Sequence, residues 1–221
     1  MARLHDGQPV LQAGEPLDGA SAAMILLHGR GATAEDIMSV GQAVSHPGFT
    51  YLAPQAAGNA WYPNRFTAPL ESNEPWLSSA LETVGRLLAR VEERLPASQV
   101  IVLGFSQGAC LTLEFAARHA RRYGGVVGLS GALIGPDDAP REYPGSLAGT
   151  PVLLGCSDSD PHVSARRVQE AGEVFRRLGG EVEVRIYPGL GHEVNEDEIR
   201  LVRALMSKLV PRDEAPTRAS R

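Results

Sequence analysis

The fold is decided by the stretch VIVLGFSQGACLTLEFAARHA, residues 100–120. It opens with a continuous apolar run typical of a buried strand, and residues 107–122 have the apolar spacing of a helix. Gly104 and Gly108 flank the point where the predicted strand ends and the predicted helix begins. Glycine relieves the crowding of such a sharp turn. The Gly-x-Ser-x-Gly pattern therefore predicts that Ser106 lies on a tight strand-to-helix turn, a position suited to a nucleophile.

Similar short apolar runs predict further buried strands on both sides of this stretch. They are AAMILLHG at 22–29, FTYLAP at 49–54, GGVVGLS at 124–130, TPVLLG at 150–155 and EVRIYP at 183–188. Helical spacing occurs between them, at 33–46, 75–95, 107–122, 165–178 and 197–210. Alternating strands and helices favour an α/β fold with one mostly parallel sheet and helices on both faces. Only about twenty residues separate the strands around 130–149, which leaves no space for a helical lid domain and predicts an open, shallow site.

Length and composition limit the classes of protein to consider. The chain has 221 residues, 43% of them hydrophobic, and a net charge of −5 without a basic stripe, so we expect no nucleic-acid partner. No apolar run approaches the roughly 18 residues of a membrane span, and the N-terminal residues do not resemble a signal peptide. These features favour a cytoplasmic protein without stable membrane insertion. We expect one domain over residues 1–210 and a flexible C-terminal tail over 211–221.

A serine hydroxyl needs a base to become a nucleophile near neutral pH, and the base needs a carboxylate to orient it. His192 follows the last predicted strand in a glycine-rich turn, and it is the one histidine after the loop that holds Asp158 and Asp160. The chain order Ser, Asp, His fits a strand-to-helix serine nucleophile. Position alone does not separate Asp158 from Asp160 as the acid, and Asp158 could instead be an Asx-turn residue that shapes the loop.

Two further features belong to the same candidate site. His28-Gly29-Arg30-Gly31 ends the first apolar strand, and the backbone N–H groups of Arg30 and Gln107 could stabilise an oxyanion. The segment 56–74 is long for a loop and carries four large apolar side chains, which are Trp61, Tyr62, Phe66 and Leu70. These side chains form either the apolar wall of a substrate pocket or a cluster that packs the loop onto the sheet.

Simpler interpretations exist for several of these residues. Ser106 could be an ordinary helix N-cap. The alternation Asp158, Asp160, His162 hints at a metal site, but the sequence has no second cluster of ligands to complete it. Cys110 and Cys156 do not form a disulfide framework and are expected to pack in the core. His5, His46 and His119 are expected to be surface or cap groups.

The motifs LLHGRGA, GFSQGACL, DSDPHVS and GLGHEV together resemble the phospholipase/carboxylesterase family of α/β-hydrolases, which includes the acyl-protein thioesterases. The resemblance spans about 22–210 and implies the α/β-hydrolase fold. By motif it makes Ser106 the nucleophile, Asp160 the acid and His192 the base, and it supports Arg30 and Gln107 as oxyanion donors. The family commonly has His-Gly where this chain has Cys156-Ser157, and Pro where it has Ser164.

The resemblance, with the WYPNRF stretch, favours a small bacterial-type carboxylesterase acting on short to medium acyl esters. The partner expected is a small-molecule ester, and the mechanism needs no cofactor and no metal. An acyl-thioesterase or lysophospholipase would use the same residues. A binding module on a hydrolase scaffold is the alternative outside enzymes, although it would have no need for the complete set of catalytic groups.

Overall fold

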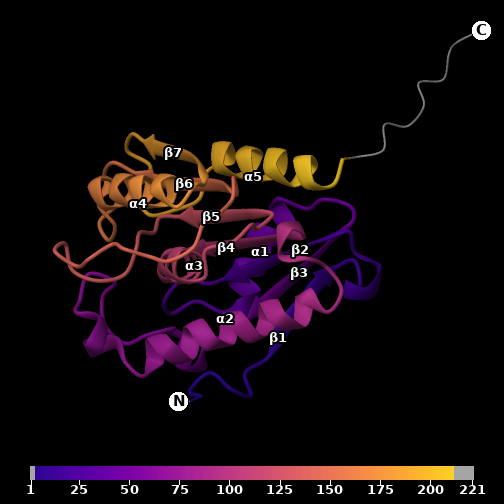
Figure 1. The fold of residues 1–221 in the computed structure, drawn as a ribbon, viewed down its shortest axis with the longest axis horizontal. Helices are drawn as coiled ribbons and strands as arrows, with labels where there is room; N and C mark the ends of the chain where they lie inside the picture. The colour runs from indigo at the N-terminus through magenta and orange to yellow at the C-terminus, as the bar shows by residue number, and fades with distance from the viewer. Residues whose placement is uncertain (1–2, 212–221) are drawn as a thin grey trace, which may run out of the picture.

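The computed structural model describes residues 3–211 and contains one seven-stranded sheet, with the strand order β1-β3-β2-β4-β5-β6-β7 (Figure 1). The strands are β1 (Val10–Gly14), β2 (Ala22–Leu27), β3 (Phe49–Pro54), β4 (Val100–Phe105), β5 (Gly125–Leu129), β6 (Pro151–Ser157) and β7 (Glu181–Tyr187). All neighbours pair in parallel except β1, which runs antiparallel to β3. The expected mostly parallel α/β architecture, an α/β-hydrolase fold, is confirmed.

The two edge strands differ from the expectation. β1 has no counterpart among the predicted strands, because its residues alternate between exposed and half-buried and make no continuous apolar run. β7 was expected to be buried, yet its residues alternate in the same way at the opposite edge. An edge strand has a neighbour on one side only, so it needs fewer apolar residues than the strands between.

Five helices follow the predicted positions: α1 (Ala34–Ala43), α2 (Trp76–Glu92), α3 (Gln107–Arg118), α4 (Ala165–Arg177) and α5 (Glu196–Leu209). Short 3₁₀ helices are η1 (Leu17–Gly19), η2 (Ala57–Asn59), η3 (Leu70–Asn73) and η4 (Ala97–Gln99). Helices α2, α3 and α4 cover one face of the sheet, while α1 and α5 cover the other. Within the described chain no helix lies between β5 and β6, where a lid domain would have to be inserted.

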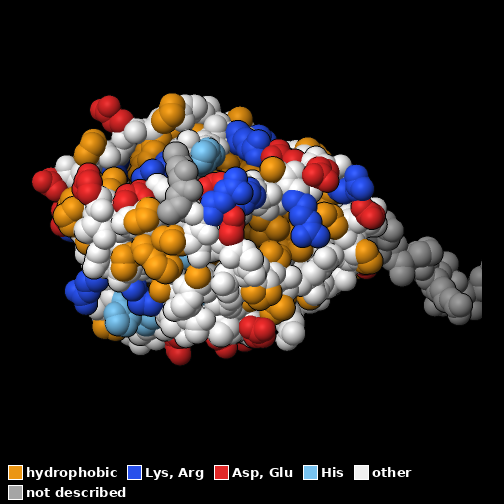
Figure 2. Space-filling view, turned by 90° about the horizontal axis from the view of Figure 1, so that it is seen from below, with side chains coloured by type: hydrophobic (Ala, Val, Ile, Leu, Met, Phe, Trp, Pro, Cys, Tyr) orange, Lys and Arg blue, Asp and Glu red, His pale blue; other side chains and the backbone are white. Residues whose placement is uncertain are grey.

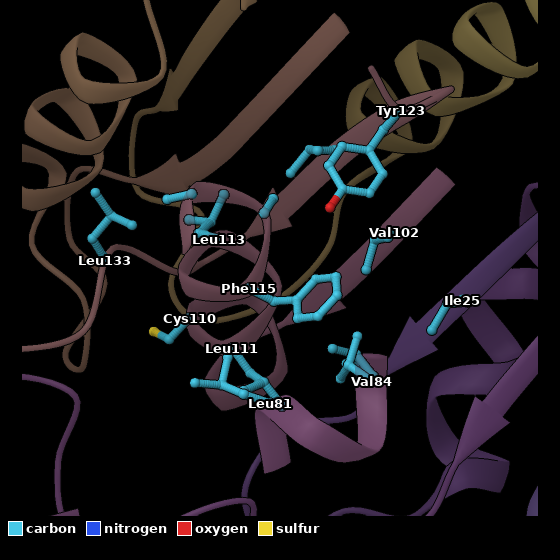
Figure 3. Packing of buried hydrophobic residues seen from close by; sticks show 14 of the residues in the cluster. Ile25, Leu81, Val84, Val102, Cys110, Leu111, Leu113, Phe115, Tyr123 and Leu133 are labelled. Atoms are coloured by element: carbon cyan, nitrogen blue, oxygen red, sulfur yellow. The ribbon is translucent and has the colours of Figure 1, made fainter. Parts of the chain in front are cut away.

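The core is divided by the sheet into two layers. Alternate side chains of β4 point to opposite faces, with Val102 in the layer under α2 and α3, and Ile101 in the layer under α1 and α5. Figure 3 shows the first layer, in which Val84 of α2 and Phe115 of α3 belong to the same cluster as Val102. The strands thereby support apolar packing on both sides, as expected for a parallel sheet.

The surface and the termini bear on the remaining expectations. On the face drawn in Figure 2, Lys and Arg side chains stand among Asp and Glu side chains instead of forming one basic surface. Among residues 3–211 the longest helices are too short or too polar to cross a membrane. The tail predicted over 211–221 lies outside the described residues, apart from Pro211.

Candidate active site

Ser106 lies at the turn between β4 and α3 with φ 54° and ψ −119°, a conformation that non-glycine residues rarely adopt. A Cβ atom at Gly108 would lie 2.0 Å from the Leu27 carbonyl oxygen, and one at Gly104 would lie 2.2 Å from the Gly108 carbonyl oxygen. Both glycines are therefore required by close backbone contacts. The Ser106 hydroxyl makes no capping hydrogen bond to α3, so the simple N-cap interpretation does not describe it.

Three side chains from three separate loops form one hydrogen-bonded series. His192 Nε2 lies 2.9 Å from Ser106 Oγ, and His192 Nδ1 lies 2.7 Å from Asp160 Oδ2. The other oxygen, Asp160 Oδ1, accepts the backbone N–H groups of His162 and Val163 at 2.8 and 3.0 Å. Because Nδ1 donates to the carboxylate, Nε2 faces Ser106 as an acceptor. The imidazole is thus oriented to take the proton of the hydroxyl.

Asp160 is held as an anion in spite of its burial. Its side chain is 0% exposed, and burial by itself would raise the pKa of the carboxyl. The hydrogen bonds from His192 and from the backbone of His162 and Val163 outweigh burial, so the pKa of Asp160 lies below its ordinary value. A carboxylate that stays charged favours the imidazolium formed when His192 accepts a proton.

Asp158 has a different place in the structure. It is exposed, and its Oδ1 accepts the backbone N–H of Gly189 at 2.9 Å. Ser157 Oγ accepts the N–H of Gly191 at 3.0 Å. These two bonds fasten the loop that carries His192 to the end of β6. The structure therefore brings Asp160 to His192 and leaves Asp158 to shape the loop.

Arg30 and Gln107 both lie on the lining of a pocket that opens onto Ser106. Within residues 3–211, neither of their backbone N–H groups donates to a protein acceptor. Their side chains both form hydrogen bonds to the backbone of residues 61–64. The Gln107 amide accepts from the Trp61 N–H at 2.9 Å and donates to the Tyr62 carbonyl at 2.8 Å, and the Arg30 guanidinium donates to the carbonyls of Pro63 and Asn64.

The pocket has a volume of about 770 Å³, within the range of roughly 300–1,000 Å³ of small-molecule sites. Of the four large side chains of the loop, Phe66 and Tyr62 are among its lining residues, although Tyr62 is only 1% exposed. Trp61 is not among them, which corrects the prediction: its side chain is fully buried and its indole N–H donates to the His28 carbonyl at 2.9 Å. Leu70 also lies elsewhere, in a hollow beside Glu114. The two side chains pack the loop onto the same apolar layer, Trp61 within it and Leu70 half-buried against it.

Several lining residues were not anticipated from the sequence. Phe105 precedes the nucleophile and stands 5.0 Å from the His192 ring, and the His162 ring lies edge-on to His192 at 4.8 Å. Arg65 and Thr67 line the pocket from the loop that follows β3. The sequence indicates these four residues only through their position next to predicted site residues.

Two histidines expected at the surface or at caps are buried instead, His5 and His46. His5 Nδ1 accepts the Ala57 N–H at 3.0 Å and its Nε2 donates to the Trp61 carbonyl at 3.0 Å, so this ring joins the N-terminal segment to the pocket loop. His28 likewise accepts the Ala56 N–H on Nε2. Burial lowers the pKa of both His5 and His28, which keeps the two rings neutral and able to accept these bonds.

Cys110 and Cys156 are free and buried, as expected. Cys156 nevertheless contacts the site, because its Sγ lies 3.7 Å from Asp160 Oδ2 and 3.5 Å from the Val163 carbonyl. Burial raises the pKa of Cys156 to about 12 and that of Cys110 to about 11. Both are therefore thiols and not thiolates. Among residues 3–211 the His, Cys, Asp and Glu side chains do not gather in a group of three or more that could hold a metal ion.

Comparison with known proteins gives the family. A family model described as Phospholipase/Carboxylesterase matches residues 10–210. A curated acyl-protein thioesterase 1 from Debaryomyces hansenii is 33% identical over 106 residues, 48% of this chain and 46% of the relative. Carboxylesterase SOBER1 from Arabidopsis thaliana is 27% identical over 135 residues, 59% of each chain. This chain thus spans about half the length of the curated relatives it matches.

Two solved structures match over nearly the whole fold. A phospholipase/carboxylesterase from Dyadobacter fermentans is 41% identical with a TM-score of 0.87, covering 90% of this chain and 96% of that one. Esterase PE8 is 25% identical with a TM-score of 0.73, covering 92% and 98%.

Proposed function

This chain belongs to the phospholipase/carboxylesterase family of α/β-hydrolases, and from that premise we propose that it hydrolyses carboxylic esters with short to medium acyl chains. The nucleophile in this proposal is Ser106, with His192 as base and Asp160 as acid. The observation that carries it is the hydrogen-bonded series from Ser106 Oγ through His192 to Asp160, in which Ser106 and His192 line the pocket.

The reaction proceeds by acyl transfer in two halves. His192 Nε2 takes the hydroxyl proton as Ser106 Oγ attacks the ester carbonyl, and the N–H groups of Arg30 and Gln107 bind the oxyanion of the tetrahedral intermediate. The intermediate collapses with loss of the alcohol, which receives the proton from His192. Water then attacks the acyl-enzyme with His192 again as base, releasing the carboxylic acid and restoring Ser106.

The acyl-chain preference rests on the shape of the pocket. Phe66 and Phe105 are half-buried and line it together with Ala32 and Pro63, while Trp61 and Leu70 lie outside its lining. A thioester is the second candidate substrate, because named relatives are acyl-protein thioesterases and the same attack by Ser106 cleaves a thioester.

The first experiment is hydrolysis of 4-nitrophenyl esters from acetate to palmitate, followed by the absorbance of the released phenol. We expect the highest kcat/KM at short to medium chains. Ser106→Ala should lose several orders of magnitude in kcat, and Asp160→Asn about four. A folded protein without activity on any chain length would overturn the proposal, and a maximum at long chains would favour a lysophospholipase or thioesterase.

A further inference from the structure

The charge on the pocket lining is opposite to the charge of the whole molecule. The chain has 26 acidic and 21 basic residues, yet the described residues that line the pocket include Arg30 and Arg65 and none is acidic. The side chain of Asp160 is fully buried and is already paired with His192. The pocket is therefore a positive region on an acidic protein.

Arg30 holds its charge at a fixed place. Its guanidinium donates to the Pro63 carbonyl at 2.7 Å and to the Asn64 carbonyl, and it lies 5.9 Å from the centre of the Tyr62 ring. Carbonyl groups are neutral acceptors, so these bonds fix the orientation of the guanidinium without cancelling its charge. The guanidinium has five N–H donors, and these two hydrogen bonds use two of them. An anion in the pocket would thus meet a charged group that is already ordered.

Arg65 is anchored by its backbone and not by its side chain. Its carbonyl accepts the Asn73 amide at 3.3 Å and the Ala68 N–H at 3.0 Å. Its exposed side chain has no carboxylate partner within 4.0 Å among residues 3–211. Arginines on α4 differ, because Arg166 and Arg167 both pair with Asp137. The Arg65 charge is consequently available to a ligand.

We propose that this pocket selects esters that carry an anionic group, which Arg65 and Arg30 bind while the ester carbonyl reaches Ser106. The inference rests on the proposed ester hydrolysis and names its substrate class. Guanidinium groups suit this task, because they bind carboxylates through paired N–H donors and keep their charge at every working pH. The apolar side chains of Phe66 and Phe105 line the rest of the pocket and would contact the carbon skeleton.

The test compares matched esters that differ in one charge. Mono-4-nitrophenyl glutarate is compared with 4-nitrophenyl pentanoate, which places the anion on the acyl side. 4-Acetoxybenzoate is compared with 4-acetoxybenzamide, which places it on the alcohol side. The quantity measured is the ratio of kcat/KM for the anionic ester to kcat/KM for its neutral partner.

We expect a ratio above one for at least one pair, falling about three- to tenfold in Arg65→Gln and falling again as salt is raised. Arg90→Gln is the control, since it removes the same charge from an exposed site on α2 outside the pocket and should leave the ratio unchanged. The pair that responds tells whether the anion belongs to the acyl or the alcohol part.

Equal or lower rates for both anionic esters, or a ratio that Arg65→Gln does not change, would overturn the inference while leaving ester hydrolysis intact. Loss of activity on all four esters would instead contradict the proposed function itself.

Discussion

Glu198 places an ionisable group in the apolar layer behind the loop that carries His192. Its Oε2 accepts the Asn195 N–H at 3.0 Å, while Oε1 is buried against Gly155 and has no hydrogen-bond partner within the described chain. Burial raises the pKa of Glu198 to about 7, so the fold favours the protonated form. The unfolded chain has the ordinary, lower pKa. Between about pH 4.5 and 7 Glu198 is therefore protonated to a greater extent in the folded state than in the unfolded chain. The contribution of Glu198 to the free energy of unfolding falls as pH rises through this range.

Glu198→Gln removes that ionisation while keeping an acceptor for the Asn195 N–H. We expect the variant to exceed the parent in free energy of unfolding by about 1–3 kcal/mol at pH 8, with the difference shrinking towards pH 4.5. Urea unfolding of both proteins at the two pH values measures this directly. A difference that is the same at both values would show that ionisation of Glu198 is not its origin.

Gln107 has a structural task besides the oxyanion role proposed for its backbone. Its buried amide satisfies the Trp61 N–H and the Tyr62 carbonyl. In Gln107→Ala both groups stay buried without partners, so the free energy of unfolding should fall by about 1–3 kcal/mol. Urea unfolding gives the value. Gln169→Ala, at an exposed position on α4, should change it by less than about 0.5 kcal/mol. Equal effects of the two substitutions would contradict this role for Gln107.

At the scale of elements, the turn between β4 and α3 depends on how closely α3 approaches β2. Gly108→Ala would set a Cβ atom 2.0 Å from the Leu27 carbonyl oxygen and 2.6 Å from that of His28. These are backbone atoms of the last residue of β2 and of the residue that follows it, which cannot move aside as a flexible side chain can. We expect Gly108→Ala to lower the free energy of unfolding by about 3 kcal/mol.

A matched glycine lies in α2. A Cβ atom at Gly85 would make only an ordinary contact, 3.7 Å from Phe115. Gly85→Ala should therefore stabilise the protein by about 0.5–1 kcal/mol, because alanine favours a helix over glycine. Thermal unfolding of Gly108→Ala, Gly85→Ala and the parent protein tests this, because the melting temperature should fall in the first variant and rise in the second. Loss of stability in both would mean that backbone approach is not what distinguishes Gly108.

The elements found from the sequence are those whose burial leaves a local pattern. β2 and β4 are covered on both faces and therefore read as continuous apolar runs, whereas β1 is an edge strand whose alternation is too weak to recognise. The site follows the same rule. Motif order located Ser106 and His192. Position alone left Asp158 and Asp160 open, because the path of the loop decides which of them faces His192, and only the family resemblance selected Asp160. The burial of Trp61 and the displacement of Leu70 likewise follow from tertiary packing, which loop composition does not encode.

For the molecule as a whole, the two core layers share the same strands. Along β2, Ala23, Ile25 and Leu27 face one layer, and Ala22, Met24 and Leu26 face the other. Each layer packs against the same strands and helps to hold them in place. If one layer loses its packing, the strands that the other layer packs against are no longer held. We therefore expect residues 3–210 to unfold as a single cooperative unit, the behaviour of the one domain that the sequence led us to expect.

Two spectroscopic signals can test this cooperativity, because they report on different parts of the molecule. The tryptophans, Trp61 and Trp76, both belong to the layer under α2 and α3, so their fluorescence follows that layer alone. Far-UV circular dichroism follows all five helices, including α1 and α5 on the other face. In urea we expect the two signals to give the same midpoint and slope. A fluorescence change complete before the loss of helical signal would mean that α1 and α5 hold their face of the sheet without the other layer, so the chain would unfold in two steps.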